Sequence, residues 1–243
     1  MEKEQEQTKY YYRLIRYVRK RILLRQTRKL AVKLALNRYL FNFSWLGRPI
    51  IQFPQDIYAL QELIFKVKPD LIVETGIAHG GSLMLSASIL SLLGGNGNVI
   101  GIDTELRDHN RREIEASPFS KRITLLDGSS TSENVVYRVK ELANYKKNVM
   151  VFLDSNHTEE HVLEELKIYS EIVTVGSYIV VFDGIIEFMP KGSNKNRPWD
   201  RGNNPYTAIK KFLKENKSFV VDEEIENRLL ITAAPKGFLK KIK

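Results

Sequence analysis

The sequence predicts one α/β domain built on a doubly wound, mostly parallel sheet of about seven strands, with an antiparallel hairpin at its edge and a basic helical arm before it. Three observations predict this class. Short apolar runs alternate with segments whose apolar residues recur at helical spacing. A glycine-rich turn joins one run to the next helix, and five runs end in an acid. Because ligands bind at the carboxyl ends of such strands, we expect these acids to meet in one crevice.

The composition is that of a protein with a full hydrophobic core. The chain has 243 residues, 43% of them hydrophobic, which suits one α/β domain with a modest extension. It contains no cysteine, which excludes disulfides, thiol catalysis and zinc–cysteine sites. No run approaches the roughly 18 apolar residues of a membrane span, and the start, MEKEQE, lacks a signal peptide's basic-then-apolar order. We therefore expect a cytoplasmic protein.

The basic residues are concentrated in the predicted arm, residues 1–44, and the main domain is predicted over residues 45–243. Residues 9–38 contain eleven basic side chains and no acid, so the net charge of +9 belongs to the arm. Leu14, Val18 and Ile22 can share one helical face. We expect this helix to pack on its own domain or on a partner subunit of a homo-oligomer, with contact between residues 9–38 and an anionic membrane as the alternative. Nucleic acid is the least favoured partner.

The elements of the main domain follow in order after a linker over residues 42–56, where Pro49 and Pro54 are expected to block a helix. A helix is predicted over residues 57–67 with Asp56 as its N-cap. The first strand, residues 71–74, leads through the glycine turn to a helix over residues 83–93. Further strands are predicted at residues 98–103, 122–127, 148–154, 177–183, 219–222 and 228–234. The short spacing of the last two indicates an antiparallel edge hairpin, and the whole order is Rossmann-like.

The glycine-rich turn reads Glu74-Thr-Gly-Ile-Ala-His-Gly-Gly-Ser82. Its glycines, Gly76, Gly80 and Gly81, can adopt positive φ and let the backbone approach a ligand, while the next helix offers free N–H groups. Two ligands fit this pattern. S-adenosylmethionine is bound with an acid just before the first glycine, where Glu74 stands. A dinucleotide is bound by T-G-x-x-x-G-x-G turns, whose last glycine is Ser82 here. A turn without a ligand is the third interpretation.

Acids end five of the predicted strands, and each is a candidate for the crevice. They are Glu74, Asp103, Asp127, Asp154 and Asp183. Asp103 stands at the position that binds ribose in nucleotide folds. The segment Asp127-Gly128-Ser129 can hold an adenine edge through its backbone N–H groups and the Ser129 hydroxyl.

An imidazole follows the acid of the fourth strand, because His157 comes three residues after Asp154. Such a pair can support a hard divalent cation or a general base that deprotonates a hydroxyl. Asp154 and Asp183, on neighbouring strand ends, are expected to share Mg²⁺. His157 and His161 also match H-x-x-x-H, but no third ligand follows in register, so zinc is disfavoured. The polar loop over residues 187–205, which contains Trp199, is expected to be a substrate lid.

Taken together and in this order, these segments resemble the cephalosporin hydroxylase family, whose members include rhamnosyl and other sugar O-methyltransferases. The resembling segments extend from about Trp45 to the end of the chain, at residues 49–56, 74–82, 101–103, 128–130, 153–157, 160–166, 176–181 and 202–205. The resemblance implies a class I methyltransferase fold, S-adenosylmethionine as cofactor and often Mg²⁺. It also implies an acceptor that is a sugar, a glycoconjugate or a related small molecule, as in carbohydrate or lipopolysaccharide biosynthesis.

The resemblance also implies roles for single residues. The cofactor residues would be Glu74, Gly76, Ala78, His79, Gly80, Gly81 and Ser82 for the methionine part, Asp103 for the ribose, and Asp127, Gly128 and Ser129 beside the adenine. Asp154 and Asp183 would hold the metal, and His157 would be the base. The sequence departs from the family at Phe182, where a carboxylate is expected beside Asp183, and at Gly184, where Thr is common.

A rival enzyme interpretation rests on Tyr206 and Lys210, a Y-x-x-x-K pair preceded by Ser193. This set resembles that of short-chain dehydrogenases, in which the Tyr donates a proton while the Lys lowers its pKa, and it would make the protein an NAD(P)-dependent oxidoreductase. Ser193, however, lies in the polar loop and not at a strand end. A third alternative is a catalytically inactive nucleotide-binding scaffold. The favoured prediction is O-methyl transfer with Asp154 and His157 as catalytic residues.

Overall fold

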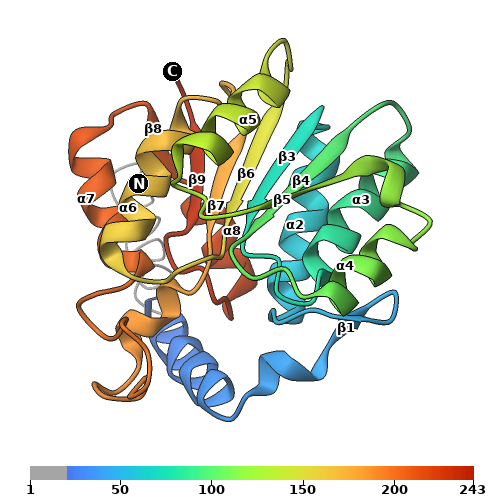
Figure 1. Ribbon diagram of the computed structural model, residues 1–243. Helices are drawn as coiled ribbons and strands as arrows, with labels where there is room; N and C mark the ends of the chain where they lie inside the picture. The colour runs from blue at the N-terminus through green and yellow to red at the C-terminus, as the bar shows by residue number, and fades with distance from the viewer. Residues whose placement is uncertain (1–20) are drawn as a thin grey trace, which may run out of the picture.

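The computed structural model describes residues 21–243 and confirms the predicted α/β class (Figure 1). The main sheet has seven strands in the order β5-β4-β3-β6-β7-β9-β8. These are β3 (Leu71–Thr75), β4 (Asn98–Asp103), β5 (Ile123–Asp127), β6 (Val149–Leu153), β7 (Tyr178–Val181), β8 (Phe219–Val221) and β9 (Phe238–Lys241). Strands β3 to β7 are parallel, and β9 runs antiparallel between β7 and β8. The carboxyl ends of the five parallel strands therefore meet at one edge.

Helices cover both faces of this sheet, which explains why its central strands are apolar on both sides. One core cluster includes residues of α2 (Pro54–Val67), α3 (Gly81–Leu93), α4 (Asp108–Glu115) and α8 (Glu223–Leu229). The other includes residues of α5 (Glu133–Ala143), α6 (Glu159–Ser170) and α7 (Pro205–Glu215). Smaller elements are β1 (Ser44–Trp45), β2 (Arg48–Pro49), η1 (Tyr39–Asn42), η2 (Ser120–Arg122) and η3 (Gly184–Phe188).

The edge of the sheet differs from the prediction. Strand β8 forms at the predicted place, but residues 228–234 are not a strand, because α8 occupies 223–229 and the antiparallel partner of β8 is β9. The side chain of Ile225 packs into the core, and Leu230, with φ of 63°, ends the helix. Only the first two residues of the predicted strand belong to α8; the rest is irregular, and its Thr232 and Ala233 bond to Asp56 instead of to a neighbouring strand.

The start of α2 also differs from the prediction. Pro54 occupies the first turn of the helix, where its missing N–H costs nothing, so it begins the helix and does not block it. Asp56 is consequently inside the first turn and is not the N-cap. Its buried carboxylate accepts hydrogen bonds from Thr232 Oγ1 (2.5 Å) and from the backbone N–H of Ala233 (2.8 Å). Asp56 thus joins α2 to the segment after α8.

The described part of the predicted arm is a helix over residues 21–36 that packs on the domain. Ala31 and Val32 are buried in a third apolar cluster with Phe53, Ile185 and other residues. The leading interpretation of the arm is therefore confirmed for this portion, while residues 9–20 lie outside the described residues. The division at residues 44 and 45 stays a prediction. None of the helices within residues 21–243 is long and apolar enough to cross a membrane.

Candidate active site

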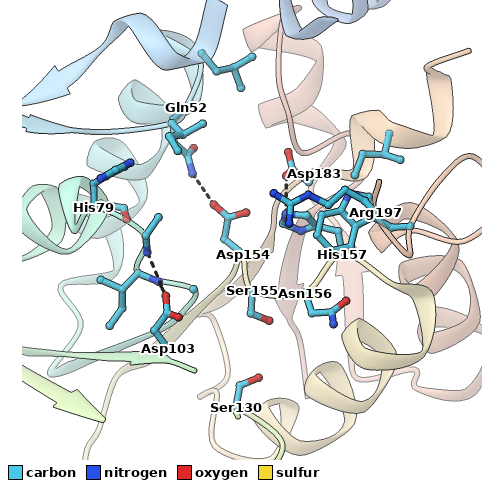
Figure 2. A pocket seen from close by; sticks show the side chains of 18 of the residues that line it. Gln52, His79, Asp103, Ser130, Asp154, Ser155, Asn156, His157, Asp183 and Arg197 are labelled. Carbon is cyan, nitrogen blue, oxygen red and sulfur yellow. Dashed lines mark hydrogen bonds and ion pairs between the residues drawn. The ribbon is translucent and has the colours of Figure 1, made fainter. Parts of the chain in front are cut away.

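A cavity of about 740 Å³ opens at the carboxyl ends of the parallel strands. At one end it is lined by the glycine turn, with Gly76, Ala78, His79 and Ser82 among its residues. Its middle contains Asp154 and His157, and its far end is lined by residues of the N-terminal segment and of the loop after β7. Figure 2 shows the labelled side chains around this opening, with Asp103 on one side and Asp183 and Arg197 on the other. The strand-end crevice predicted from the row of acids is therefore present.

The glycines of the turn are required mainly by close contacts within the protein. Gly76 has φ of 83°, and a Cβ there would lie 2.1 Å from the backbone oxygen of Asp154. A Cβ on Gly81 would lie 2.3 Å from the backbone oxygen of Pro49. Both residues line the cavity, and neighbouring backbone excludes larger side chains from them. Gly76 and Gly80 have the predicted positive φ, whereas Gly81 does not, and the close approach of this backbone to a ligand stays a prediction.

Three side chains hold the turn in position. Asp103 Oδ2 accepts hydrogen bonds from the backbone N–H groups of Ile77 (2.8 Å) and Ala78 (3.2 Å). Arg48 donates from Nε to the backbone oxygen of His79 (2.9 Å), and Asn110 donates to that of Ala78 (2.9 Å). Asp103 lines the cavity as predicted, and part of its carboxylate organises the turn. The roles of Arg48 and Asn110 were not predicted, because nothing local in the sequence links them to the turn.

Glu74 lies beneath the turn and is almost completely buried, and it is not among the cavity-lining residues. Its Oε1 accepts a hydrogen bond from Ser82 Oγ, and its Oε2 is buried with no partner. Burial raises the pKa of Glu74 to about 8, although the hydrogen bond from Ser82 acts to lower this pKa. Glu74 therefore supports the first turn of α3 through Ser82, while its predicted contact with a cofactor stays a prediction.

Asp154, His157 and Asp183 come together in the middle of the cavity. One ligand atom from each lies within 4.8 Å of the other two, and this is the one such group of three found among residues 21–243. His157 Nε2 lies 3.0 Å from Asp183 Oδ2. Gln52 Nε2 donates to Asp154 Oδ2 (3.3 Å), and the buried Gln52 Oε1 has no partner. The predicted pair of carboxylates is thus assembled with the predicted imidazole, whereas Phe182 is buried in the core and offers no ligand atom.

The surroundings of Asp154 disfavour a negative charge on its carboxyl group. Burial raises the pKa of this carboxyl well above its usual range, and the charges of Asp183, Glu74, Glu165 and Asp56 raise it further. Several buried carboxylates around one point favour a cation, because a positive charge would offset their mutual repulsion.

The loop after β5 is only partly placed as predicted. Gly128 and Ser129 line the cavity, but Asp127 does not, and its Oδ2 lies 2.5 Å from Arg111 Nη2 on α4. The pairing makes Asp127 a partner of α4, and its predicted position beside an adenine stays a prediction.

A buried network below this loop was missed by the sequence reasoning. Glu165 Oε1 accepts hydrogen bonds from Ser130 Oγ (2.6 Å) and Ser155 Oγ (2.7 Å), and Glu165 Oε2 is buried without a partner. His161 Nε2 lies 3.1 Å from Ser130 Oγ. Burial lowers the pKa of His161, but the hydrogen bond and charge of Glu165 outweigh it, so the net pKa is raised. The available signal was the i, i+4 spacing of His161 and Glu165 on one helix face.

The loop over residues 187–205 lines one side of the cavity, and its role as a substrate lid stays a prediction. The ring of Trp199 packs edge-on against His157, with 4.7 Å between ring centroids, and Arg197 lies over Trp199 at 5.2 Å. The base of the loop is fixed by Glu187 Oε2, which accepts from the backbone N–H of Gly202 (2.8 Å) and from Asn204 Nδ2 (2.7 Å). The loop therefore orients His157 and closes one side of the site.

The N-terminal segment forms the opposite wall, which the sequence did not predict. Ala35, Leu40 and Phe41 line the cavity, although they precede the glycine turn by about forty residues. Arg28 joins this helix to the domain, because Nη2 donates to Glu226 Oε1 (2.9 Å) and the guanidinium lies 4.3 Å from the centroid of the Phe188 ring.

The residues of the rival oxidoreductase interpretation do not reach the cavity. Tyr206 lies on α7, with its ring edge-on against Phe188 at 5.2 Å between centroids. Neither Tyr206 nor Lys210 nor Ser193 is among the cavity-lining residues. The geometry therefore removes the basis of that alternative.

Comparison with known proteins identifies the family of this chain. A family model described as "Rhamnosyl O-methyltransferase/CmcI" matches residues 37–242. The chain belongs to this family. Rhamnosyl O-methyltransferases of Mycobacterium bovis and Mycobacterium leprae are similar to it, with 30% identity over 201 residues and 26% over 198. The matches cover 81% of this chain in both cases, and 77% and 82% of the respective relatives.

Solved structures show the same fold at lower identity. A CmcI structure without ligand gives a TM-score of 0.59 at 17% identity, covering 84% of this chain and 77% of that one. A CmcI complex with Mg and SAM gives a TM-score of 0.59 at 16% identity, and the match covers 84% of this chain and 78% of that one. An O-methyltransferase from Bacillus cereus with SAH gives a TM-score of 0.52 at 15% identity, and the match covers 82% of this chain and 81% of that one. The predicted fold, family resemblance and methyltransferase class are thereby confirmed, and S-adenosylmethionine dependence is confirmed at the level of the family.

Proposed function

We propose that this protein transfers the methyl group of S-adenosylmethionine to a hydroxyl of a sugar, a glycoconjugate or a related small molecule. The observation that supports this most directly is one cavity that joins a glycine turn at one end to Asp154, His157 and Asp183 in its middle. The first end suits the cofactor and the middle suits deprotonation of an acceptor. The curated relatives named rhamnosyl O-methyltransferases support a sugar as acceptor.

The cofactor fits the end of the cavity formed by the turn. Gly76, Ala78, His79 and Ser82 line this end together with Asp103, Gly128 and Ser129. Asp103 is proposed to bind the ribose with the part of its carboxylate that the turn leaves available, and Gly128 and Ser129 to lie beside the adenine. The positive sulfonium would in turn favour the ionised forms of the buried acids around Asp154, because opposite charges attract more strongly where water is excluded.

A divalent cation fits the middle of the cavity. Asp154 and Asp183 supply the carboxylate oxygens that Mg²⁺ prefers, and the unpartnered Gln52 Oε1 lies on a side chain already bonded to Asp154. Bound there, the cation would polarise the acceptor hydroxyl and lower its pKa. The complex of CmcI with Mg and SAM, a protein of the same fold, supports this proposal.

His157 is the proposed base, and Asp183 and Trp199 contact its ring. Its Nε2 faces the carboxylate of Asp183, which would stabilise the imidazolium formed when His157 takes the hydroxyl proton. Trp199 packs against the ring and restricts its rotation. Transfer is an in-line displacement, in which the acceptor oxygen must come within about 3 to 3.5 Å of the methyl carbon. The walls on both sides of His157 would hold the acceptor in that approach.

Titration calorimetry with S-adenosylhomocysteine and, separately, with NADP⁺ tests the cofactor. We expect micromolar binding of the former and none of the latter, with Mg²⁺ changing the heat of binding. A panel of rhamnosides and other glycosides with [methyl-³H]S-adenosylmethionine then tests the acceptor. Binding of NADP⁺ alone would overturn the proposal, and binding of neither would favour a scaffold. Cytoplasmic location, homo-oligomer formation and contact of residues 9–38 with a membrane stay predictions.

A further inference from the structure

The helix over residues 21–36, η1 and the tip of the β1–β2 hairpin follow one another along one side of the cavity mouth. Figure 1 shows them as a continuous stretch below the carboxyl ends of the strands. Phe41 of η1 belongs both to this stretch and to the cavity lining. We call the exposed side of residues 21–46 the rim.

Among the described residues, the rim exposes several large apolar side chains. Their exposed fractions lie between 44% and 63%. They are Ile22, Leu23, Leu30, Leu36, Phe41 and Leu46. Leu46, at the hairpin tip, has φ of 48°, a conformation that a leucine rarely adopts, and is the most exposed of the six. Exposed apolar residues gathered on one side of a domain indicate an interaction surface.

Basic side chains are interleaved with these apolar ones. Arg25, Lys29, Lys33 and Arg38 are exposed on the same stretch, and the guanidinium of Arg38 lies 4.6 Å from the centroid of the Phe41 ring. The chain has no acidic residue between Glu6 and Asp56. The rim is therefore apolar and positively charged at once, with no acid of its own.

We propose that the rim docks on an anionic lipid bilayer. Apolar side chains can enter the boundary between headgroups and acyl chains, while the surrounding Lys and Arg pair with lipid phosphates and carboxylates. A nucleic acid would use the basic residues but not Leu30, Leu36 or Leu46. A second copy would bring two positive rims together, which like-charge repulsion opposes.

This docking would turn the cavity mouth toward the lipid surface, because Phe41 is exposed on the rim and also lines the cavity. An acceptor hydroxyl displayed at that surface would then reach Asp154 and His157 without crossing bulk water. This consequence rests on the proposed function, whereas the docking itself does not.

Co-sedimentation of the full chain with vesicles of phosphatidylcholine alone, and of equal parts phosphatidylcholine and phosphatidylglycerol, tests the docking. We expect binding to the anionic vesicles only, weakened by 0.5 M salt because screening shortens the reach of the charges. The double variant Lys29→Glu/Lys33→Glu should lower the partition coefficient at least tenfold, and Leu46→Ser several-fold. The matched control is Lys121→Glu/Lys147→Glu, the same charge change on exposed residues before β5 and β6, at the opposite end of the sheet.

Calorimetry with S-adenosylhomocysteine on every variant distinguishes a docking defect from a folding or cofactor defect. The proposal predicts wild-type cofactor affinity in the two rim variants and wild-type vesicle binding in the control. It is overturned if the wild-type protein does not bind anionic vesicles, if the rim variants bind like the wild type, or if the control loses as much as they do. Tighter binding to a duplex oligonucleotide than to vesicles would also overturn it.

Discussion

The two ends of the cavity are built in different ways. The glycine turn follows a central strand and is held by Asp103 on the adjacent strand, so the sheet itself positions the cofactor end. The acceptor end is assembled from the helix over residues 21–36, η1, η3 and the loop before α7, none of which pairs in the sheet. The difference indicates that substitutions at the proposed cofactor end would disturb the sheet itself. At the proposed acceptor end, the shape of the cavity can change through the packing of separate segments.

The largest effect is expected at Asp154, where the two ends meet. Asp154→Asn keeps the shape but removes the carboxylate that faces Gln52 and Asp183, so kcat should fall about 10³-fold through lost charge and proton-transfer chemistry. Affinity for S-adenosylhomocysteine should change less than about threefold, because the turn and Asp103 are untouched. Single-turnover kinetics and calorimetry measure the two quantities. Asp108→Asn, at an exposed position of α4, is the matched control. A loss of cofactor affinity in Asp154→Asn as large as its loss of kcat would contradict the separation of the two ends.

Glu74 tests how tightly the cofactor end is built. Its folded-state pKa of about 8 lies above the unfolded value, so the protein gains stability from the protonated form at low pH and loses it as the pH rises through 8. In ligand-free protein, the wild type should lose about 3 kcal/mol more stability than Glu74→Gln between pH 6 and 9. Urea unfolding at both pH values measures the difference. Parallel losses in the two proteins would show that Glu74 is already ionised at pH 6.

His157 tests the acceptor side of the junction. His157→Gln should lower kcat about 10²-fold, because it removes the proposed base while leaving a polar side chain beside Asp183 and Trp199. The KM for S-adenosylmethionine should stay near its wild-type value. Steady-state kinetics with a saturating acceptor measures both. Retention of wild-type kcat would assign proton removal to water or to a carboxylate.

The smallest effect is expected at Arg28, which only fastens the acceptor wall. Arg28→Ala removes a partly exposed ion pair with Glu226 and a contact with Phe188, and should cost about 1 kcal/mol of stability. The KM for the acceptor should rise two- to fourfold with cofactor affinity unchanged, and thermal unfolding with initial rates measures both. Arg25→Ala, on the exposed side of the same helix, is the matched control. Equal effects of the two variants would mean that the helix does not shape the acceptor end through Arg28.

Much of the fold and of the chemistry was predictable from the sequence. The apolar runs of β3 to β7 and the acids that end them were identified correctly, because parallel strands and their carboxyl-end crevice depend on local pattern and chain order. The edge of the sheet was not predicted correctly, since residues 228–234 form the end of α8 and an irregular segment that is held by bonds to the distant Asp56. The contacts of Arg48, Asn110 and Glu165 also depend on partners far away in the chain.

By itself the sequence determined the order of the strands from β3 to β8, the glycine turn, the family and the residue types at the strand ends. These properties are local or periodic, and a single stretch of chain is enough to express them. Only the tertiary structure decided that Ala35, Leu40 and Phe41 line the cavity, that the backbone of Asp154 requires a glycine at position 76, and that His157 faces Asp183. Each of these depends on the close approach of segments distant in sequence, which packing specifies and local pattern does not.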